Sequence, residues 1–144
     1  MAVSLVCERL TTGRITAIDR SHAAITAATA RNRDHVAAGK VTLEAVPLAD
    51  AAFTGRRFDK IFAVNVNAFW TTGMRELAIV KRALHSQGTL YLVYQPPTAG
   101  QLATLSGKVK STLERAGLGV ASITTERRGT PLLCVSARVP LHSP

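Results

Sequence analysis

Short apolar segments alternate with segments of helical periodicity along most of this chain. The pattern predicts helices over residues 2–10, 21–38, 71–88 and 102–116, and strands over residues 14–19, 40–46, 60–65 and 89–94. The strand at 60–65 is almost continuously apolar, which is typical of a buried parallel strand. Strands and helices that alternate in this way predict a doubly wound α/β fold, in which helices cover both faces of a mostly parallel sheet.

The C-terminal part of the chain departs from this alternation. Two strands are predicted over residues 120–125 and 132–139, and the segment Arg127-Arg128-Gly129-Thr130 joins them. Such a connection is too short for a parallel crossover, so the two strands must form an antiparallel hairpin. The predicted fold class is therefore Rossmann-like, with a mostly parallel sheet, a C-terminal antiparallel hairpin and a single domain over residues 1–144.

Composition and charge limit the classes of function. The chain has no apolar run of about 18 residues, so no membrane span is expected. Its two cysteines form no CxxC pair, and no cluster of side chains has the spacing of a metal site, which together indicate a cytoplasmic protein with reduced thiols. The net charge of +9 is scattered along the chain, which favours an ordinary basic surface over a groove for nucleic acid.

One acidic residue stands where a strand gives way to a helix. Asp19 ends the apolar segment 14–19, and Ser21 begins the next helix. In nucleotide-binding α/β folds, an acidic side chain at such a strand tip binds the ribose hydroxyls of the nucleotide. The alternative is a structural role, in which Asp19 caps the helix that starts near Ser21. The position at the strand tip favours ribose binding.

The segment before this strand is short. In such folds the strand with the acidic tip is normally the second of the sheet, and a first strand and a Gly-rich loop precede it. None of the first twelve residues is Gly, and residues 2–10 have helical rather than strand periodicity. We therefore expect a fold that lacks the first strand, in a domain that is incomplete at its N-terminus.

Four segments and the terminal hairpin carry a resemblance to a known family. The segments are GRITAIDRS, KVTLEAVP, RRFDKIFAVNVNAFW and ALHSQGTLYLVYQPP, which start at Gly13, Lys40, Arg56 and Ala83. Together they resemble the class I S-adenosylmethionine-dependent methyltransferases, of the bacterial type that acts on small molecules. The resemblance implies a sheet of order 3-2-1-4-5-7-6 with strand 7 antiparallel. It also implies S-adenosylmethionine as the cofactor and a small-molecule methyl acceptor as the partner.

The resemblance also assigns residues to the cofactor. It implies that Asp19 binds the ribose, that Arg20 packs near the adenine, and that Pro47 and Leu48 contact the adenine where the family usually has an Asp. Asn65 and Val66 would lie at the end of the fourth strand, beneath the methionine half of the cofactor, although Asn65 is equally well explained as a turn residue. Phe69 and Trp70 would either form a wall of the substrate site or pack in the core. No catalytic residue and no metal ligand is assigned.

Three functions follow from these patterns. The first is methyl transfer from S-adenosylmethionine to a small molecule. The second is a catalytically inactive oligomeric or partner-binding form of the same fold, in which a second copy of the chain fills the place of the missing central strand. This alternative arises because the absent strand would leave buried backbone groups of its two neighbours unpaired, at about 1–3 kcal/mol per group. The third is nucleic-acid binding through the basic surface.

Overall fold

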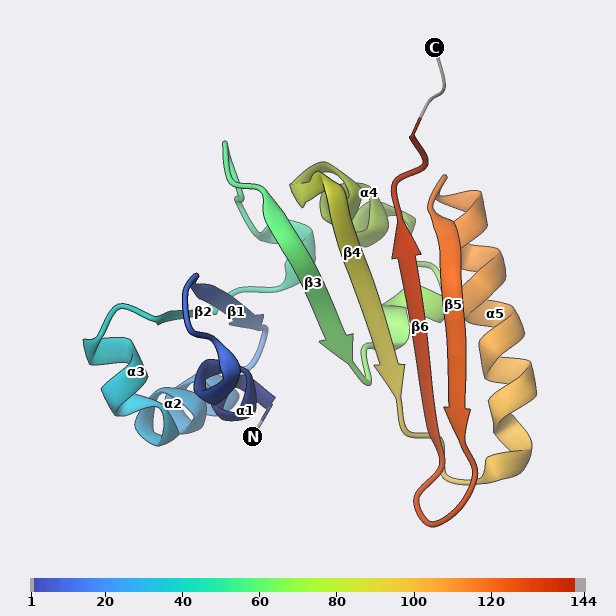
Figure 1. The fold of residues 1–144 in the computed structure, drawn as a ribbon, viewed down its shortest axis with the longest axis horizontal. Coiled ribbons are helices and arrows are strands. Elements are labelled where there is room, and N and C mark those ends of the chain that lie inside the picture. The colour runs from blue at the N-terminus through green and yellow to red at the C-terminus, as the bar shows by residue number, and fades with distance from the viewer. Residues whose placement is uncertain (1, 142–144) are drawn as a thin grey trace. The chain divides into compact units, whose positions relative to one another are not determined.

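The computed structural model describes residues 2–141 and separates into two compact units. Unit 1 is Met1–Ala52 and unit 2 is Phe53–Pro144 (Figure 1). The strands form a two-stranded sheet, β1-β2, and a four-stranded sheet of order β3-β4-β6-β5. The α/β class with a mixed sheet is confirmed, and the single domain over 1–144 stays a prediction.

Unit 1 consists of a small parallel sheet and helices. Its elements are α1 (Ala2–Arg9), β1 (Ile15–Asp19), α2 (His22–Arg31), α3 (Arg33–Ala37), β2 (Val41–Ala45) and the 3-10 helix η1 (Leu48–Asp50). Strands β1 and β2 pair in parallel, with Asp19 aligned to Ala45. The carboxyl ends of β1 and β2 therefore lie side by side, and the residues predicted to bind the cofactor follow or form these ends.

The helix predicted over residues 21–38 is interrupted at Asn32, and this prediction was wrong. The Asn32 side chain donates a hydrogen bond to the carbonyl oxygen of Ala28 at 2.7 Å and accepts one from the Ser4 hydroxyl at 2.9 Å. Asn32 is also buried, with 2% of its surface exposed. An Asn side chain that bonds to nearby backbone competes with regular helical hydrogen bonding, and here it divides the segment into α2 and α3.

Unit 2 contains the larger sheet and its helices. Its elements are β3 (Phe58–Val64), η2 (Asn67–Trp70), α4 (Met74–Ala83), β4 (Leu84–Tyr94), η3 (Ala99–Gln101), α5 (Leu102–Arg115), β5 (Gly119–Glu126) and β6 (Leu132–Arg138). Strands β3 and β4 are parallel, whereas β6 is antiparallel to both β4 and β5. The predicted C-terminal hairpin is therefore confirmed.

The boundary between α4 and β4 differs from the prediction. The helix begins at Met74 rather than at residue 71, and it ends at Ala83 rather than at Gly88. Residues 84–88 instead extend β4, and the register of the β3–β4 pair is irregular there, because Phe58 pairs with Leu84 but Lys60 pairs with Thr89. A Cβ atom at Gly88 would lie 2.8 Å from the carbonyl oxygen of Phe58, so glycine permits this close approach of the two strands.

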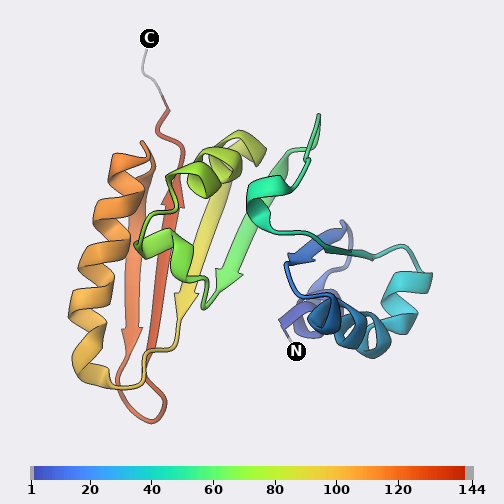
Figure 2. The same cartoon turned by 180° about the vertical axis from the view of Figure 1, so that it is seen from behind.

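The core of unit 2 lies on one face of its sheet. Leu90, Leu92, Leu133 and Val135 are fully buried on that face, which α4 and α5 cover (Figure 2). The expectation that residues 60–65 form a buried strand was wrong, because Phe62 is 40% and Val64 is 47% exposed. The physical reason is that β3 is an edge strand, which pairs only with β4 among the described residues. No helix in the described part of the chain is long and apolar enough to cross a membrane.

Candidate functional site

Asp19 lies at the carboxyl end of β1 and is exposed. Its Oδ1 atom accepts a hydrogen bond from the backbone N–H of Ser21 at 2.8 Å. The Ser21 hydroxyl in turn accepts one from the N–H of Ala24 at 3.2 Å and caps α2. Ser21 rather than Asp19 therefore caps α2, and Asp19 makes a structural contact with the N–H of the capping residue, which restricts the orientation of its carboxylate. Ribose binding by Asp19 stays a prediction.

Three further predicted residues lie at the same edge of unit 1. Arg20 follows Asp19 directly and is exposed. Pro47 and Leu48 follow β2, whose last residue is aligned with Asp19. Pro47 accepts a hydrogen bond from the N–H of Asp50 at 3.0 Å, which closes the turn η1. Unit 1 therefore brings Asp19, Arg20, Pro47 and Leu48 to one edge of its parallel sheet, the edge where α/β proteins bind ligands.

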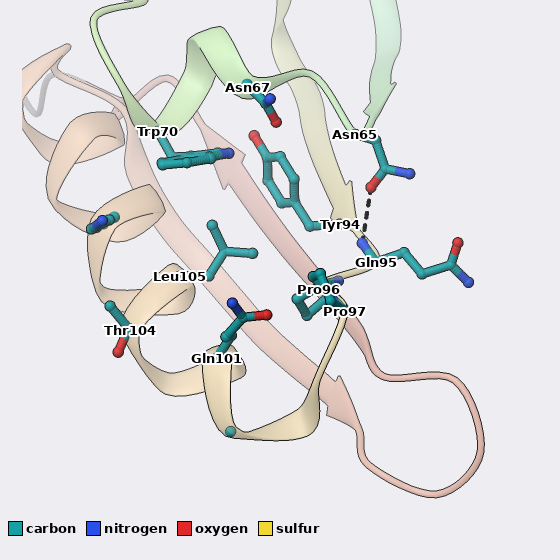
Figure 3. Close-up of a pocket in the computed structure, with 12 residues that line it drawn as sticks. Asn65, Asn67, Trp70, Tyr94, Gln95, Pro96, Pro97, Gln101, Thr104 and Leu105 are labelled. Atoms are coloured by element: carbon teal, nitrogen blue, oxygen red, sulfur yellow. Dashed lines mark hydrogen bonds between the residues drawn. The ribbon is translucent and has the colours of Figure 1, made fainter.

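The other two predicted residues lie in unit 2, at the carboxyl end of β3. Asn65 has a φ angle of 55°, in the left-handed region, where Asn is tolerated better than most residues. Its N–H donates to the carbonyl of Val93 at 2.9 Å. Its side-chain oxygen accepts from the N–H of Gln95, also at 2.9 Å (Figure 3). Asn65 is therefore a turn residue that joins the ends of β3 and β4.

Val66 is held by a buried tyrosine. The Tyr94 hydroxyl donates a hydrogen bond to the carbonyl oxygen of Val66 at 3.0 Å, and Tyr94 is only 3% exposed. Burial raises the pKa of Tyr94 above its ordinary value of 10.0. The hydroxyl therefore stays protonated at neutral pH and fixes the backbone that follows β3.

A pocket of about 360 Å³ opens at the carboxyl ends of β3 and β4. It lies entirely within unit 2 and includes Asn65 (Figure 3). The lining residues come from the two strand ends, η2, the loop after β4, η3 and α5: Asn65, Asn67, Trp70, Tyr94, Gln95, Pro96, Pro97, Gly100, Gln101, Thr104, Leu105 and Lys108. Its size falls in the range of small-molecule sites.

The two aromatic residues of η2 differ in their surroundings. Phe69 is 1% exposed and packs in the core, whereas Trp70 lines the pocket. The Nζ atom of Lys108 lies 5.3 Å from the centre of the Trp70 ring, within the range of a cation–π contact. The core role is therefore confirmed for Phe69, and a role of Trp70 as a wall of the substrate site stays a prediction.

Sequence reasoning did not identify the helical side of this pocket. Thr104, Leu105 and Lys108 line it from α5, where spacings of three and four residues to Lys108 place them on one face, and Gln101 lines it from the N-cap position of that helix. The signal available in the sequence was the row of polar residues beside the apolar stripe of the helix predicted over residues 102–116. No group of three His, Cys, Asp or Glu side chains suited to a metal ion occurs within residues 2–141.

Comparison with known proteins identifies the family. A family profile described as a methyltransferase domain matches residues 2–92. The chain belongs to the methyltransferase domain family. This agrees with the resemblance to class I S-adenosylmethionine-dependent methyltransferases. No curated protein matches the chain closely enough to count as a relative.

Solved structures of methyltransferases and related proteins share the fold. An S-adenosylmethionine-dependent methyltransferase from Clostridium acetobutylicum is 10% identical, with a TM-score of 0.72 over 95% of this chain and 78% of that one. The [4+2]-cyclase SpnF is 14% identical, with a TM-score of 0.75 over 96% and 71% of the two chains. The mitomycin 7-O-methyltransferase MmcR is 16% identical, with a TM-score of 0.76 over 96% and 45%. These similarities show the methyltransferase fold, and the cyclase shows that this fold also serves another reaction.

The turn at Asn65 gives a first prediction about stability. Asn65→Ala should lower the free energy of unfolding by about 1–2 kcal/mol, because Ala is strained in the left-handed region and cannot accept from Gln95. Asn65→Asp keeps an acceptor oxygen and should cost less. Urea denaturation measures both. Asn67→Ala is the control in the same pocket wall and should stay within about 0.5 kcal/mol of the wild type; equal losses at both positions would contradict the role of Asn65.

Tyr94 gives a prediction about alkaline pH. Its folded pKa is raised, so above pH 10.0 the unfolded tyrosine loses its proton while the folded one keeps it, and stability falls as pH rises. Tyr94→Phe should cost about 1 kcal/mol at neutral pH and should lack this alkaline loss. Urea denaturation of both proteins on either side of pH 10.0 tests this. Parallel curves for the two proteins would show that Tyr94 is not the group responsible.

Proposed function

We propose that this methyltransferase domain transfers a methyl group from S-adenosylmethionine to a small molecule. The observation that carries the proposal is the exposed carboxylate of Asp19 at the carboxyl end of β1. Its two oxygens are suited to accept hydrogen bonds from two neighbouring ribose hydroxyls. The contact with the Ser21 N–H restricts the orientation of this carboxylate before any ligand binds.

The residues present fit the adenosine part of this cofactor. Asp19 would bind the ribose, while Arg20, Pro47 and Leu48 at the same edge would contact the adenine through apolar and backbone groups. The family resemblance assigns Asn65 and Val66 to the methionine part, and within unit 2 their backbone is held by the bonds to Gln95 and Tyr94. When bound, S-adenosylmethionine supplies a methyl group activated by its positive sulfonium. Methyl transfer of this kind depends on proximity and alignment, so we assign no general base.

The pocket of unit 2 is the proposed site of the methyl acceptor. It is large enough for a small molecule, and rigid side chains such as Trp70, Pro96 and Pro97 form its apolar walls. The loop after β4 contributes these prolines, and the corresponding loop is one of the regions that determine acceptor specificity in the methyltransferases that this chain resembles. The position at the carboxyl ends of β3 and β4 supports this assignment.

Calorimetric titration tests the cofactor assignment. The protein should bind S-adenosylmethionine and S-adenosylhomocysteine at micromolar concentrations, because the ribose and adenine contacts are common to both. Adenine alone should bind far more weakly, since it lacks the ribose that Asp19 would hold. The absence of heat at high protein concentration with either nucleoside would refute the proposal.

A second candidate function rests on the open edge of β3. Among the described residues β3 pairs only with β4, and its side chains Phe62 and Val64 are exposed. An unpaired strand edge with apolar side chains favours pairing with another chain. This candidate predicts a dimer by light scattering that Phe62→Asp dissociates. A wild-type protein that remains monomeric at high concentration would exclude it.

A further inference from the structure

The pocket of unit 2 has one charged side chain among its described lining residues. That residue is Lys108, on α5, and no Asp or Glu lines the pocket. The walls around it are aromatic or conformationally restricted, and include Trp70, Tyr94, Pro96 and Pro97. Figure 3 shows that Trp70, Tyr94 and Leu105 face one another across this space. A flat apolar body with a negative group at one end therefore matches both the shape and the charge of the pocket.

The ammonium group of Lys108 has an aromatic neighbour but no acidic one. Its Nζ atom lies 5.3 Å from the centre of the Trp70 ring, and no described carboxylate lies within ion-pair distance of it. Lys110, two residues further along α5, instead pairs with Glu114 at 3.9 Å. Two lysines of one helix thus differ, because Lys110 has a partner in the chain and Lys108 has none among the described carboxylates.

From this arrangement we infer that the acceptor is a small aromatic acid whose carboxylate pairs with Lys108. The inference rests on the proposed function, since it names the class of molecule that the acceptor pocket takes. Lys108 is a binding residue that selects for negative charge, and Trp70 fixes the ammonium group at the pocket wall. A carboxylate that enters here meets a cation and no competing negative side chain of the lining.

Trp70 makes direct measurement of binding straightforward. It is the only tryptophan of the chain, so its fluorescence reports on this pocket alone. The probes are 4-hydroxybenzoate and its uncharged analogue 4-hydroxybenzamide, titrated without cofactor. The acid should bind the wild-type protein about tenfold more tightly than the amide, which corresponds to about 1.4 kcal/mol. Lys108→Gln should remove this preference and leave the affinity for the amide unchanged.

Lys110→Gln is the matched control, because it removes a positive charge from the same helix outside the pocket lining. This variant should keep the preference of the wild type for the acid. Equal affinity of the wild type for acid and amide would overturn the inference, as would an equal loss of preference in both lysine variants. Titration with S-adenosylmethionine is independent of this experiment. If no cofactor binds but the preference for the acid remains, the proposed function fails and the charge selectivity of the pocket stands.

Discussion

Asp19→Ala should weaken the binding of S-adenosylmethionine about a hundredfold or more. The carboxylate would accept two hydrogen bonds from the ribose, and a bond to a charged group contributes about 1.5–3 kcal/mol. Their joint loss of about 3 kcal/mol corresponds to a factor of about a hundred in the dissociation constant. Calorimetric titration of the wild type and the variant measures the difference. The same variant should fold normally, because the bond that it loses to Ser21 is exposed.

Two further variants separate ribose binding from the structural contact. Asp19→Asn keeps an oxygen that can accept from the Ser21 N–H, but it has no negative charge, so stability should be retained while affinity falls. Asp34→Ala removes another exposed carboxylate of unit 1, on α3, and should leave affinity unchanged. Wild-type affinity in Asp19→Ala would contradict the assignment. So would an equal loss in Asp34→Ala, because that loss would reflect net charge rather than the strand tip.

Elements determined by local sequence were predicted well. The apolar periodicity of residues 102–116 corresponds to α5, and the chain leaves that helix at Gly117, whose φ angle is +73°. The short connection between the last strands was enough to predict their antiparallel pairing. These features depend on neighbours within a few residues.

Features that depend on distant contacts were missed. The break at Asn32 involves Ser4, which lies 28 residues earlier in the chain. The exposure of Phe62 and Val64 depends on the position of β3 at the edge of its sheet, and an apolar run does not reveal the order of strands. The positions of Asp19 and Asn65 at strand ends were predicted because a strand end is visible in the sequence, and their roles toward a cofactor stay predictions. Lys108 was missed because the role proposed for it depends on Trp70, which contacts it from another element.

Gly73→Ala should lower the free energy of unfolding by about 3 kcal/mol. A Cβ atom at this position would collide with the carbonyl group of Ala68, whose carbon would lie only 2.7 Å away. The same carbonyl accepts a hydrogen bond from the N–H of Gly73 at 2.8 Å, so it cannot move away without losing that bond. Overpacking in a buried site typically costs about 1–3 kcal/mol, and here backbone rather than a flexible side chain must shift. Urea denaturation followed by tryptophan fluorescence measures the loss.

The collision at Gly73 should also disturb the pocket of unit 2, the proposed acceptor site. Ala68 belongs to η2, and the next two residues are the buried Phe69 and the pocket residue Trp70. A displaced η2 would move the Trp70 ring away from Lys108, so the preference for an aromatic acid should fall together with stability. Gly107→Ala is the control, because no atom lies within 4 Å of its Cβ position and Ala favours a helix interior by about 0.5–1 kcal/mol. It should stabilise the protein slightly and leave the fluorescence titration unchanged. If Gly73→Ala were as stable as the wild type, η2 could move away from the added Cβ atom at little cost in free energy. That result would contradict a rigid η2 that holds Trp70 against Lys108.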